Sequence, residues 1–227
     1  MNLKTSIECV LFDLDGTLID TAPDFVFVVN QLLAECSKPG IKSNHIYQTV
    51  SDGARALIKL AFDIEEEHED FSKLNSRLLE LYAKKLETTE SLLYPGIDLL
   101  LLELEKSGIS WGIVTNKPEF YSKKLLSQMN LLTRCSALVC PDHVENPKPH
   151  PDAILLACQL LNCDLGKTIF IGDHFRDIQA AKNADVIAVA AEYGYISPDM
   201  KIEDWYADFI VKESIKILPL LNTLKFT

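Results

Sequence analysis

The sequence predicts an α/β fold in which a doubly wound parallel sheet carries an all-helical cap inserted after the first strand. The apolar run at Val10–Phe12 lacks polar alternation, which is typical of a strand buried on both faces. From about residue 97 onward, strand-like and helix-like segments alternate, which favours a parallel sheet with crossover helices. Between these regions, residues 20–90 show helical periodicity only.

The first strand is expected to end near Asp13, and helices follow it. Thr21-Ala22-Pro23 is typical of a helix start, because proline is tolerated in the first turn. Pro39-Gly40 then ends that helix. Apolar residues at helical spacing predict three more helices before residue 90, at about 44–50, 53–62 and 69–86.

The alternating segments begin after Tyr94-Pro95-Gly96. Strands are expected at 110–114, 137–140, 168–171, 186–190 and 209–211. Helices are expected at about 97–107, 119–129, 151–161 and 176–184, with a further closing helix. Residues 1–19 and 91–227 then form one core domain, and residues 20–90 form a cap domain large enough for a small lid.

The composition is that of an acidic globular protein, with 227 residues, a formal net charge of -11 and a pI near 4.9. Such a surface repels nucleic acid and anionic membranes, so we expect neither as a partner. No apolar stretch reaches the length of about 18 residues that indicates a membrane-spanning helix, and the N-terminus does not resemble a secretory signal. Six cysteines without a C-x-x-C pair indicate reduced thiols. Together these features predict a cytoplasmic protein.

Two acids come directly after the first strand, Asp13 and Asp15, with Gly16 next in the chain. In open parallel sheets, ligands bind beyond the carboxyl ends of the strands. Side chains two apart on a strand share a face, so we expect both carboxylates to point toward one substrate. Two anions so close together need a cation to offset their repulsion, which suggests a metal. The same residues also occur in ordinary turns.

Three further polar sites follow predicted strands or lie in the loops after them. Thr115 and Asn116 end one strand, where a hydroxyl and backbone amides make either an anion-binding corner or a helix cap. Asp173 and Asp177 are spaced to face one hard cation such as Mg²⁺, or to act as a cap and a solvated helix residue. Lys148 lies between two prolines that restrict the backbone around its charge, although a lone lysine is more typical of an ordinary surface.

In combination, these motifs resemble those of the haloacid dehalogenase superfamily across essentially the whole chain. The matching segments are Asp13-x-Asp15-Gly-Thr-Leu, a hydrophobic residue followed by Thr115-Asn116, Lys148-Pro, and Gly172-Asp173-x3-Asp177. The resemblance implies a Rossmann-like core, and the helical insertion resembles the first cap type of the superfamily.

The resemblance also implies the chemistry of the two N-terminal acids. Asp13 would attack phosphorus and form an aspartyl-phosphate. Asp15 would protonate the leaving oxygen and later take a proton from water. Dehalogenases lack a second acid of this kind, so dehalogenation is not expected.

The remaining motif residues would bind the metal and the phosphoryl group. Mg²⁺ would be held by Asp13, the Asp15 backbone carbonyl and Asp173, with Asp177 steadying a water ligand. The phosphoryl oxygens would be held by Thr115, the Asn116 amide and Lys148, so that Thr115 and Lys148 are also catalytic.

Within the superfamily, the chain resembles the phosphoglycolate phosphatase group. Finer features resemble the branch of N-acetylmuramic acid 6-phosphate phosphatases of cell-wall recycling. The resemblance is carried by Trp111–Pro118, Cys140–Val144, Tyr193–Ile196 followed by a segment with Trp205, and Ser51–Ala56. This implies a Mg-dependent hydrolase of a small carboxylate-bearing or sugar phosphate, with N-acetylmuramic acid 6-phosphate as the first candidate. The alternatives are 2-phosphoglycolate as the substrate and a β-phosphoglucomutase-like sugar phosphomutase.

Arg55 is the candidate for substrate selection, because a cap arginine can pair with a substrate carboxylate, although it is also typical of a solvated helix residue. Two positions depart from the pattern of the relatives. Asp52 stands where this branch more usually has glycine, and Asp185 stands where the superfamily typically has glycine, which bears on local turn geometry. The expected partner is a small-molecule phosphate monoester, and the sequence leaves a monomer and a homodimer both open.

Overall fold

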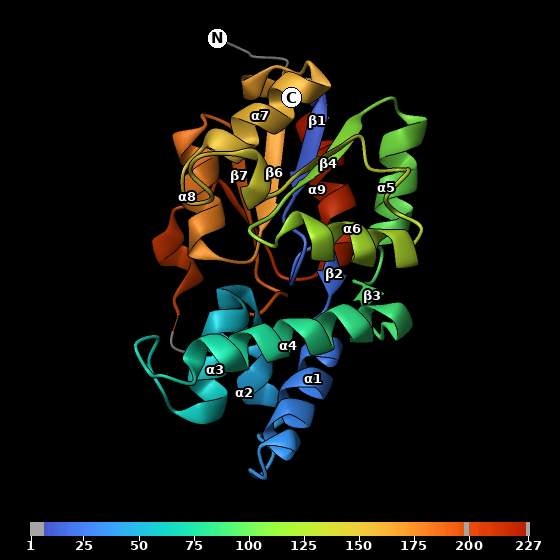
Figure 1. The fold of residues 1–227 in the computed structure, drawn as a ribbon. Helices are drawn as coiled ribbons and strands as arrows, with labels where there is room; N and C mark the ends of the chain where they lie inside the picture. Colours follow the sequence, from blue (N-terminus) through green and yellow to red (C-terminus); the bar gives the residue numbers. More distant parts are fainter. Residues whose placement is uncertain (1–6, 198–199, 226–227) are drawn as a thin grey trace.

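The central sheet has six parallel strands in the order β5-β4-β1-β6-β7-β8 (Figure 1). A computed structural model describes residues 7–197 and 200–225, so residues 1–6, 198–199 and 226–227 of the expected core domain lie outside it. The strands of this sheet are β1 (Cys9–Phe12), β4 (Ser110–Val114), β5 (Ala137–Val139), β6 (Thr168–Gly172), β7 (Ile187–Ala191) and β8 (Phe209–Val211).

Helices cover both faces of this sheet (Figure 1). They are α5 (Ile97–Lys106), α6 (Glu119–Gln128), α7 (Asp152–Leu161), α8 (Phe175–Asn183) and α9 (Ile217–Lys225). Within the described ranges, we find no helix that combines the length and the apolar composition needed to cross a membrane.

The apolar side chains of the strands alternate between two hydrophobic cores. Val10 and Phe12 belong to the core that also contains the buried residues of α5, α6 and α9. Cys9 and Leu11 belong to the core formed with α7 and α8. Because every residue of β1 is fully buried, its run of apolar residues is required on both sides. This confirms the doubly wound α/β fold that the sequence predicts.

A separate group of helices lies beyond the carboxyl ends of the strands (Figure 1). It consists of α1 (Ala22–Glu35), α2 (Ser43–Tyr47), α3 (Gly53–Phe62) and α4 (Phe71–Lys85). The longest two pack together, and Phe25 of α1 stacks on Tyr82 of α4 with ring centroids 4.2 Å apart. Residues 20–90 remain our proposal for the bounds of a cap domain.

The helical group leaves and rejoins the core through two short strands. These are β2 (Ile19–Asp20) and β3 (Leu92–Leu93), which pair antiparallel. Neither strand was predicted, because a strand of two residues carries no periodicity. It was also wrong to expect one helix over 44–50, since α2 ends at Tyr47 and a separate 3₁₀ helix covers Val50–Asp52.

Asp185 lies in the turn between α8 and β7. Its φ is +55°, in the left-handed region that an L-residue other than glycine adopts at a cost. This turn is made here by an aspartate, which tolerates the left-handed region better than most side chains do.

Candidate active site

Polar residues follow three neighbouring strands at the same edge of the sheet. Asp13 follows β1, Thr115 follows β4 and Asp173 follows β6. Since β1 lies between β4 and β6, this edge is where the connections diverge to opposite sides of the sheet. Ligands of open α/β sheets bind at such a point. The structure thus brings together residues that are up to 160 positions apart in the sequence.

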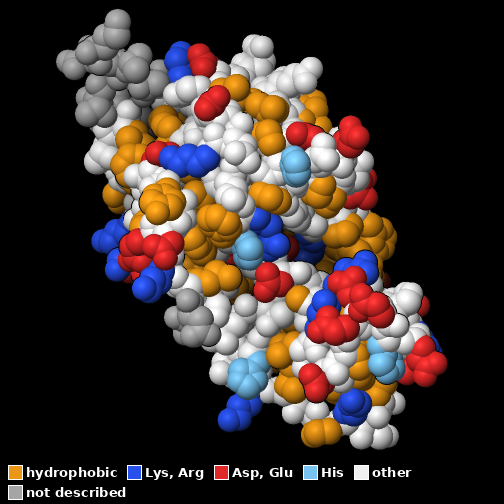
Figure 2. Space-filling view, turned by 90° about the vertical axis from the view of Figure 1, so that its left-hand side faces the viewer, with side chains coloured by type: hydrophobic (Ala, Val, Ile, Leu, Met, Phe, Trp, Pro, Cys, Tyr) orange, Lys and Arg blue, Asp and Glu red, His pale blue; other side chains and the backbone are white. Residues whose placement is uncertain are grey.

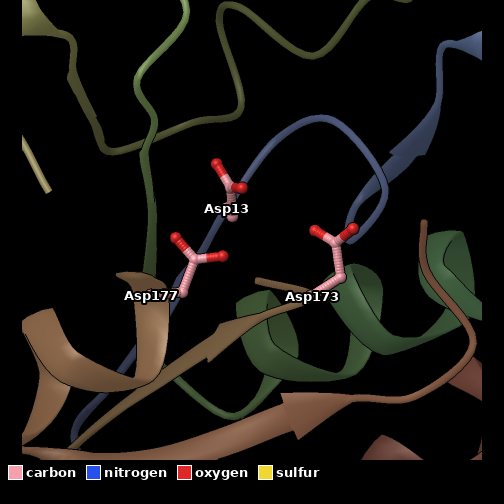
Figure 3. A group of neighbouring side chains, drawn as sticks. All are labelled: Asp13, Asp173 and Asp177. Carbon is pink, nitrogen blue, oxygen red and sulfur yellow. The ribbon is translucent and has the colours of Figure 1, made fainter. Parts of the chain in front are cut away.

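Asp13, Asp173 and Asp177 form a buried acidic cluster (Figure 3). One carboxylate oxygen of each residue lies within 4.8 Å of those of the other two. Asp177 reaches the cluster from the first turn of α8. Carboxylate oxygens grouped in this way are the ligands that hard divalent cations prefer.

Asp173 is fixed by three hydrogen-bond donors from distant parts of the chain. Its Oδ1 accepts from the Thr17 hydroxyl at 3.0 Å. Its Oδ2 accepts from the Ser51 hydroxyl at 3.0 Å and from the Tyr195 backbone N–H at 2.9 Å. Gly194 packs so closely that a Cβ there would lie 2.2 Å from the Cβ of Asp173. Ser51 and Tyr195 had no assigned role in the sequence analysis, because no local pattern links them to Asp173.

Lys148 is the cation buried against this cluster. Its Nζ lies 2.9 Å from Asp13 Oδ1 and 2.7 Å from Asp177 Oδ1. The ammonium also donates to the Val114 carbonyl at 2.9 Å. Burial opposes the charged form, but the two carboxylates outweigh this effect and raise the pKa of Lys148, so it stays protonated.

Asn116 holds the backbone of Lys148 in place. Its Nδ2 donates to the Lys148 carbonyl at 2.9 Å, and its Oδ1 accepts from the Lys148 N–H at 3.1 Å. The Asn116 side chain is therefore committed to positioning the lysine loop. This leaves the Asn116 backbone amide as its group for binding an anion.

The electrostatics of the cluster fit a divalent cation. Burial raises the pKa of the Asp13 carboxyl, against the opposing effect of Lys148. Burial, followed by the charges of Asp13 and Asp177, raises the pKa of Asp173 to about 7. One ammonium does not balance three buried carboxylates, and the all-oxygen donor set is the one that Mg²⁺ prefers.

Asp15 stands outside the acidic cluster and pairs with Lys117. The Lys117 ammonium lies 2.8 Å from Asp15 Oδ1, and both side chains are largely buried. Because β1 ends at Phe12, strand alternation does not bring Asp13 and Asp15 together. The two residues lie in the turn after the strand, and both line the same cavity.

That cavity has a volume of about 410 Å³ and lies between the sheet edge and the helical group. Figure 2 shows the surface hollowed between the two parts, with basic side chains visible inside. Of the predicted site residues, the cavity is lined by Asp13, Asp15, Arg55, Thr115 and Asn116. The others, Lys148, Asp173 and Asp177, lie buried behind this lining.

Arg55 lies at the exposed rim of the cavity. Its side chain is 63% exposed and forms an ion pair with Glu66. Arg176, which the sequence analysis did not single out, also lines the cavity and donates to the Ser51 carbonyl. The structure therefore places two arginines, on α3 and α8, in the lining of the cavity.

Sequence comparison supports what this geometry indicates. A model of the family described as haloacid dehalogenase-like hydrolase matches residues 10–191. The chain belongs to this family. The match spans all the motif residues named above.

Individual relatives of this haloacid dehalogenase-like hydrolase are named as phosphatases. N-acetylmuramic acid 6-phosphate phosphatases from Pseudomonas putida and Pseudomonas aeruginosa are 38% and 37% identical over 96% of this chain, covering 97% and 96% of their own lengths. A phosphoglycolate phosphatase from Xanthomonas campestris pv. campestris is 37% identical over 91% of this chain and 92% of its own. A crystal structure described as a predicted phosphoglycolate phosphatase from Haemophilus somnus has a TM-score of 0.84 and 26% identity over 95% of this chain and 98% of its own. The chain is a phosphatase of this family.

Proposed function

We propose that this phosphatase hydrolyses a phosphate monoester with Mg²⁺ through an aspartyl-phosphate on Asp13. The observation that carries the proposal is the position of Asp13, which belongs to the acidic cluster and also lines the cavity. Its Oδ1 accepts from the Leu14 N–H at 2.7 Å and lies 2.9 Å from the Lys148 ammonium. The carboxylate is thus held in one orientation at the point where a substrate enters.

In the first step, an Asp13 oxygen bonds to phosphorus as the bond from phosphorus to the alcohol oxygen breaks. Asp15 gives its proton to that alcohol oxygen. In the second step, Asp15 takes a proton from water, and the water oxygen bonds to phosphorus. The bond between phosphorus and Asp13 then breaks, phosphate leaves, and both acids return to their starting states.

The residues around Asp13 stabilise the negative charge of the phosphoryl group. Mg²⁺ held by Asp13, the Asp15 backbone carbonyl and Asp173 would supply the positive charge that offsets the phosphoryl oxygens. Asp177 would steady a water ligand of the ion. Thr115 Oγ1 accepts from the Lys117 N–H at 3.1 Å, so its own hydrogen is available to donate to a phosphoryl oxygen. The Asn116 backbone amide and the Lys148 ammonium would act beside it.

We propose N-acetylmuramic acid 6-phosphate as the substrate. Two relatives that carry this activity in their names match nearly the full length of the chain. A second candidate is 2-phosphoglycolate, favoured by the phosphoglycolate phosphatase that is 37% identical. Both compounds carry a carboxylate, for which Arg55 or Arg176 would be the partner.

Phosphate release with Mg²⁺ should be measured for both candidates, for hexose phosphates and for a chromogenic phosphate. Asp13→Asn should lower the rate by about a thousandfold or more, because it removes the attacking group. Rapid acid quenching followed by mass spectrometry should find phosphate on the wild-type peptide that contains Asp13. Asp204→Asn is the matched control, since it makes the same change at an exposed acid on a distant 3₁₀ helix.

Unchanged rates in Asp13→Asn would rule out this residue as the nucleophile. Formation of an isomeric sugar phosphate without phosphate release would instead indicate a phosphomutase. Equal, weak rates on every compound would contradict the proposed substrate.

A further inference from the structure

Two buried polar atoms of α4 lack a hydrogen-bond partner among the residues that the structure describes. They are the Tyr82 hydroxyl and Asn75 Oδ1. Tyr82 is only 2% exposed, and both residues line the cavity in front of Asp13. Buried polar groups are nearly always paired, because an unpaired one keeps its full cost of desolvation.

The two atoms lie on one face of the helix. Asn75, Leu79 and Tyr82 are spaced at i, i+4 and i+7, and all three line the cavity. Leu78 and Leu81 do not line the cavity and are buried in the hydrophobic core, to which the Tyr82 ring also belongs. The stripe of Asn75, Leu79 and Tyr82 therefore borders the cavity, and the adjacent stripe packs only the protein interior.

Tyr82 cannot turn its hydroxyl away to find another partner. Its ring stacks on Phe25 at 4.2 Å between centroids, and it lies against Tyr121 at 5.7 Å. The Lys117 ammonium sits over the same ring, 4.6 Å from its centroid. Burial, followed by the nearby charge of Asp15, raises the pKa of Tyr82 well above its usual value, so the hydroxyl stays a donor.

The chemistry of this stripe defines what it can bind. Asn75 Oδ1 accepts a hydrogen bond from an N–H or O–H group, and the Tyr82 hydroxyl donates to an oxygen. Much of the remaining lining near it is apolar, including Phe25, Leu79 and Tyr121. The volume of about 410 Å³ is within the range of about 300–1,000 Å³ that is usual for sites of larger organic ligands. A two-carbon acid phosphate would leave most of this space and both polar atoms unused.

We infer that Asn75 and Tyr82 form a subsite for the polar substituents, hydroxyl or acylamino, of a sugar-sized leaving alcohol. The inference rests on the proposed function and adds the residues that select the substrate. By satisfying both atoms only when a sugar phosphate is bound, the subsite favours sugar phosphates over 2-phosphoglycolate.

The test compares kcat/KM for sugar phosphates with kcat/KM for 2-phosphoglycolate. Tyr82→Phe and Asn75→Ala should each lower this ratio by about 10- to 100-fold, which is the effect of one lost hydrogen bond to a buried group. N-acetylglucosamine 6-phosphate and glucose 6-phosphate distinguish an acylamino group from a hydroxyl as the group recognised. Tyr206→Phe and Ser76→Ala are matched controls, because both residues are exposed and outside the cavity lining.

A second measurement separates recognition from a structural role. In the absence of substrate, Tyr82→Phe should raise Tm by about 2–4 °C, because it removes an unpaired buried hydroxyl and keeps the ring contacts. A hydroxyl that merely supports the fold would give a lower Tm instead.

The outcomes distinguish failure of the inference from failure of the proposed function. If wild type releases phosphate and the ratio is unchanged in both variants, the subsite is refuted. If wild type releases no phosphate from any compound, the proposed function fails. Calorimetric binding of N-acetylglucosamine 6-phosphate to wild type and to Tyr82→Phe then still decides the subsite, with equal affinities refuting it.

Discussion

Asp173 in its ionised form destabilises the metal-free folded protein. Burial and the charges of Asp13 and Asp177 raise its pKa to about 7, compared with about 3.9 in an unfolded chain. The folded state therefore keeps a proton that the unfolded state releases, and the stability this contributes is complete below about pH 4 and lost as pH rises through about 7. The difference between the folded and unfolded pKa values corresponds to roughly 4 kcal/mol in the free energy of unfolding, at about 1.4 kcal/mol per pH unit.

The assay is urea unfolding in EDTA at several pH values, with Asp173→Asn beside wild type. The variant cannot ionise, so its free energy of unfolding relative to wild type should rise by about 3 kcal/mol between pH 4.5 and pH 8, which covers most of the full difference. Any constant cost of losing an acceptor for Ser51 or the Tyr195 N–H cancels in this comparison. Asp204→Asn is again the control, because it makes the same change at an exposed acid outside the acidic cluster.

Mg²⁺ should stabilise wild type more at pH 8 than at pH 5.5, because protons compete with the metal for the carboxylates. Asp173→Asn should lose most of this stabilisation. The reasoning is refuted if the difference between variant and wild type in EDTA stays constant with pH. It is equally refuted if Mg²⁺ stabilises both proteins to the same extent.

Two further substitutions test positioning and backbone strain. Asn116→Ala removes both hydrogen bonds that hold the Lys148 backbone, so the free energy of unfolding should fall by about 1–3 kcal/mol and kcat by at least tenfold. The control is Asn146→Ala, in the loop that contains Lys148, which loses one hydrogen bond that does not involve Lys148. An equal loss of kcat in this control would contradict the role of Asn116 in positioning Lys148. Asp185→Gly should raise the free energy of unfolding by ~0.5–1 kcal/mol, because glycine adopts the left-handed region without the clash of a Cβ. Asp185→Ala keeps the Cβ and should not raise the free energy of unfolding. Equal stabilisation of the two variants would refute backbone strain at Asp185 as the cause.

The sequence predicted the fold because the large elements carry either a continuous apolar run or a helical period. The apolar runs of β1, β4 and β6 reflect burial on both faces, and the 3.6-residue spacing of α1, α3 and α4 reflects one buried side. β2 and β3 are too short to carry either signal. They pair with each other where the chain enters and leaves the helical group, and this pairing forms only when the chain is folded.

The candidate site also contains residues that the sequence predicts and residues that it does not. Asp13, Thr115 and Asp173 were predictable as neighbours, because each follows a strand and strand ends meet at one edge. Ser51 contacts Asp173 across 122 positions of sequence, and this depends on how the helical group docks on the sheet. Tyr82 falls within the helix predicted at about 69–86 and is buried, but periodicity does not show that this residue lines a cavity or that its hydroxyl lacks a partner among the described residues.

The charge balance of the cavity explains why a phosphate site with four acidic residues needs a cation. Asp13, Asp15, Asp173 and Asp177 bring four potential negative charges to the strand ends, and the two nearby ammonium groups of Lys117 and Lys148 are already paired with them. A phosphate dianion entering this space would meet an excess of negative charge inside a protein whose net charge is already -11. A divalent cation at the cluster would remove this excess beside Asp13, where the proposed mechanism places the phosphoryl group. The inferred subsite of Asn75 and Tyr82 would then select the alcohol, so that binding of phosphate and recognition of its leaving group rest on different parts of the chain.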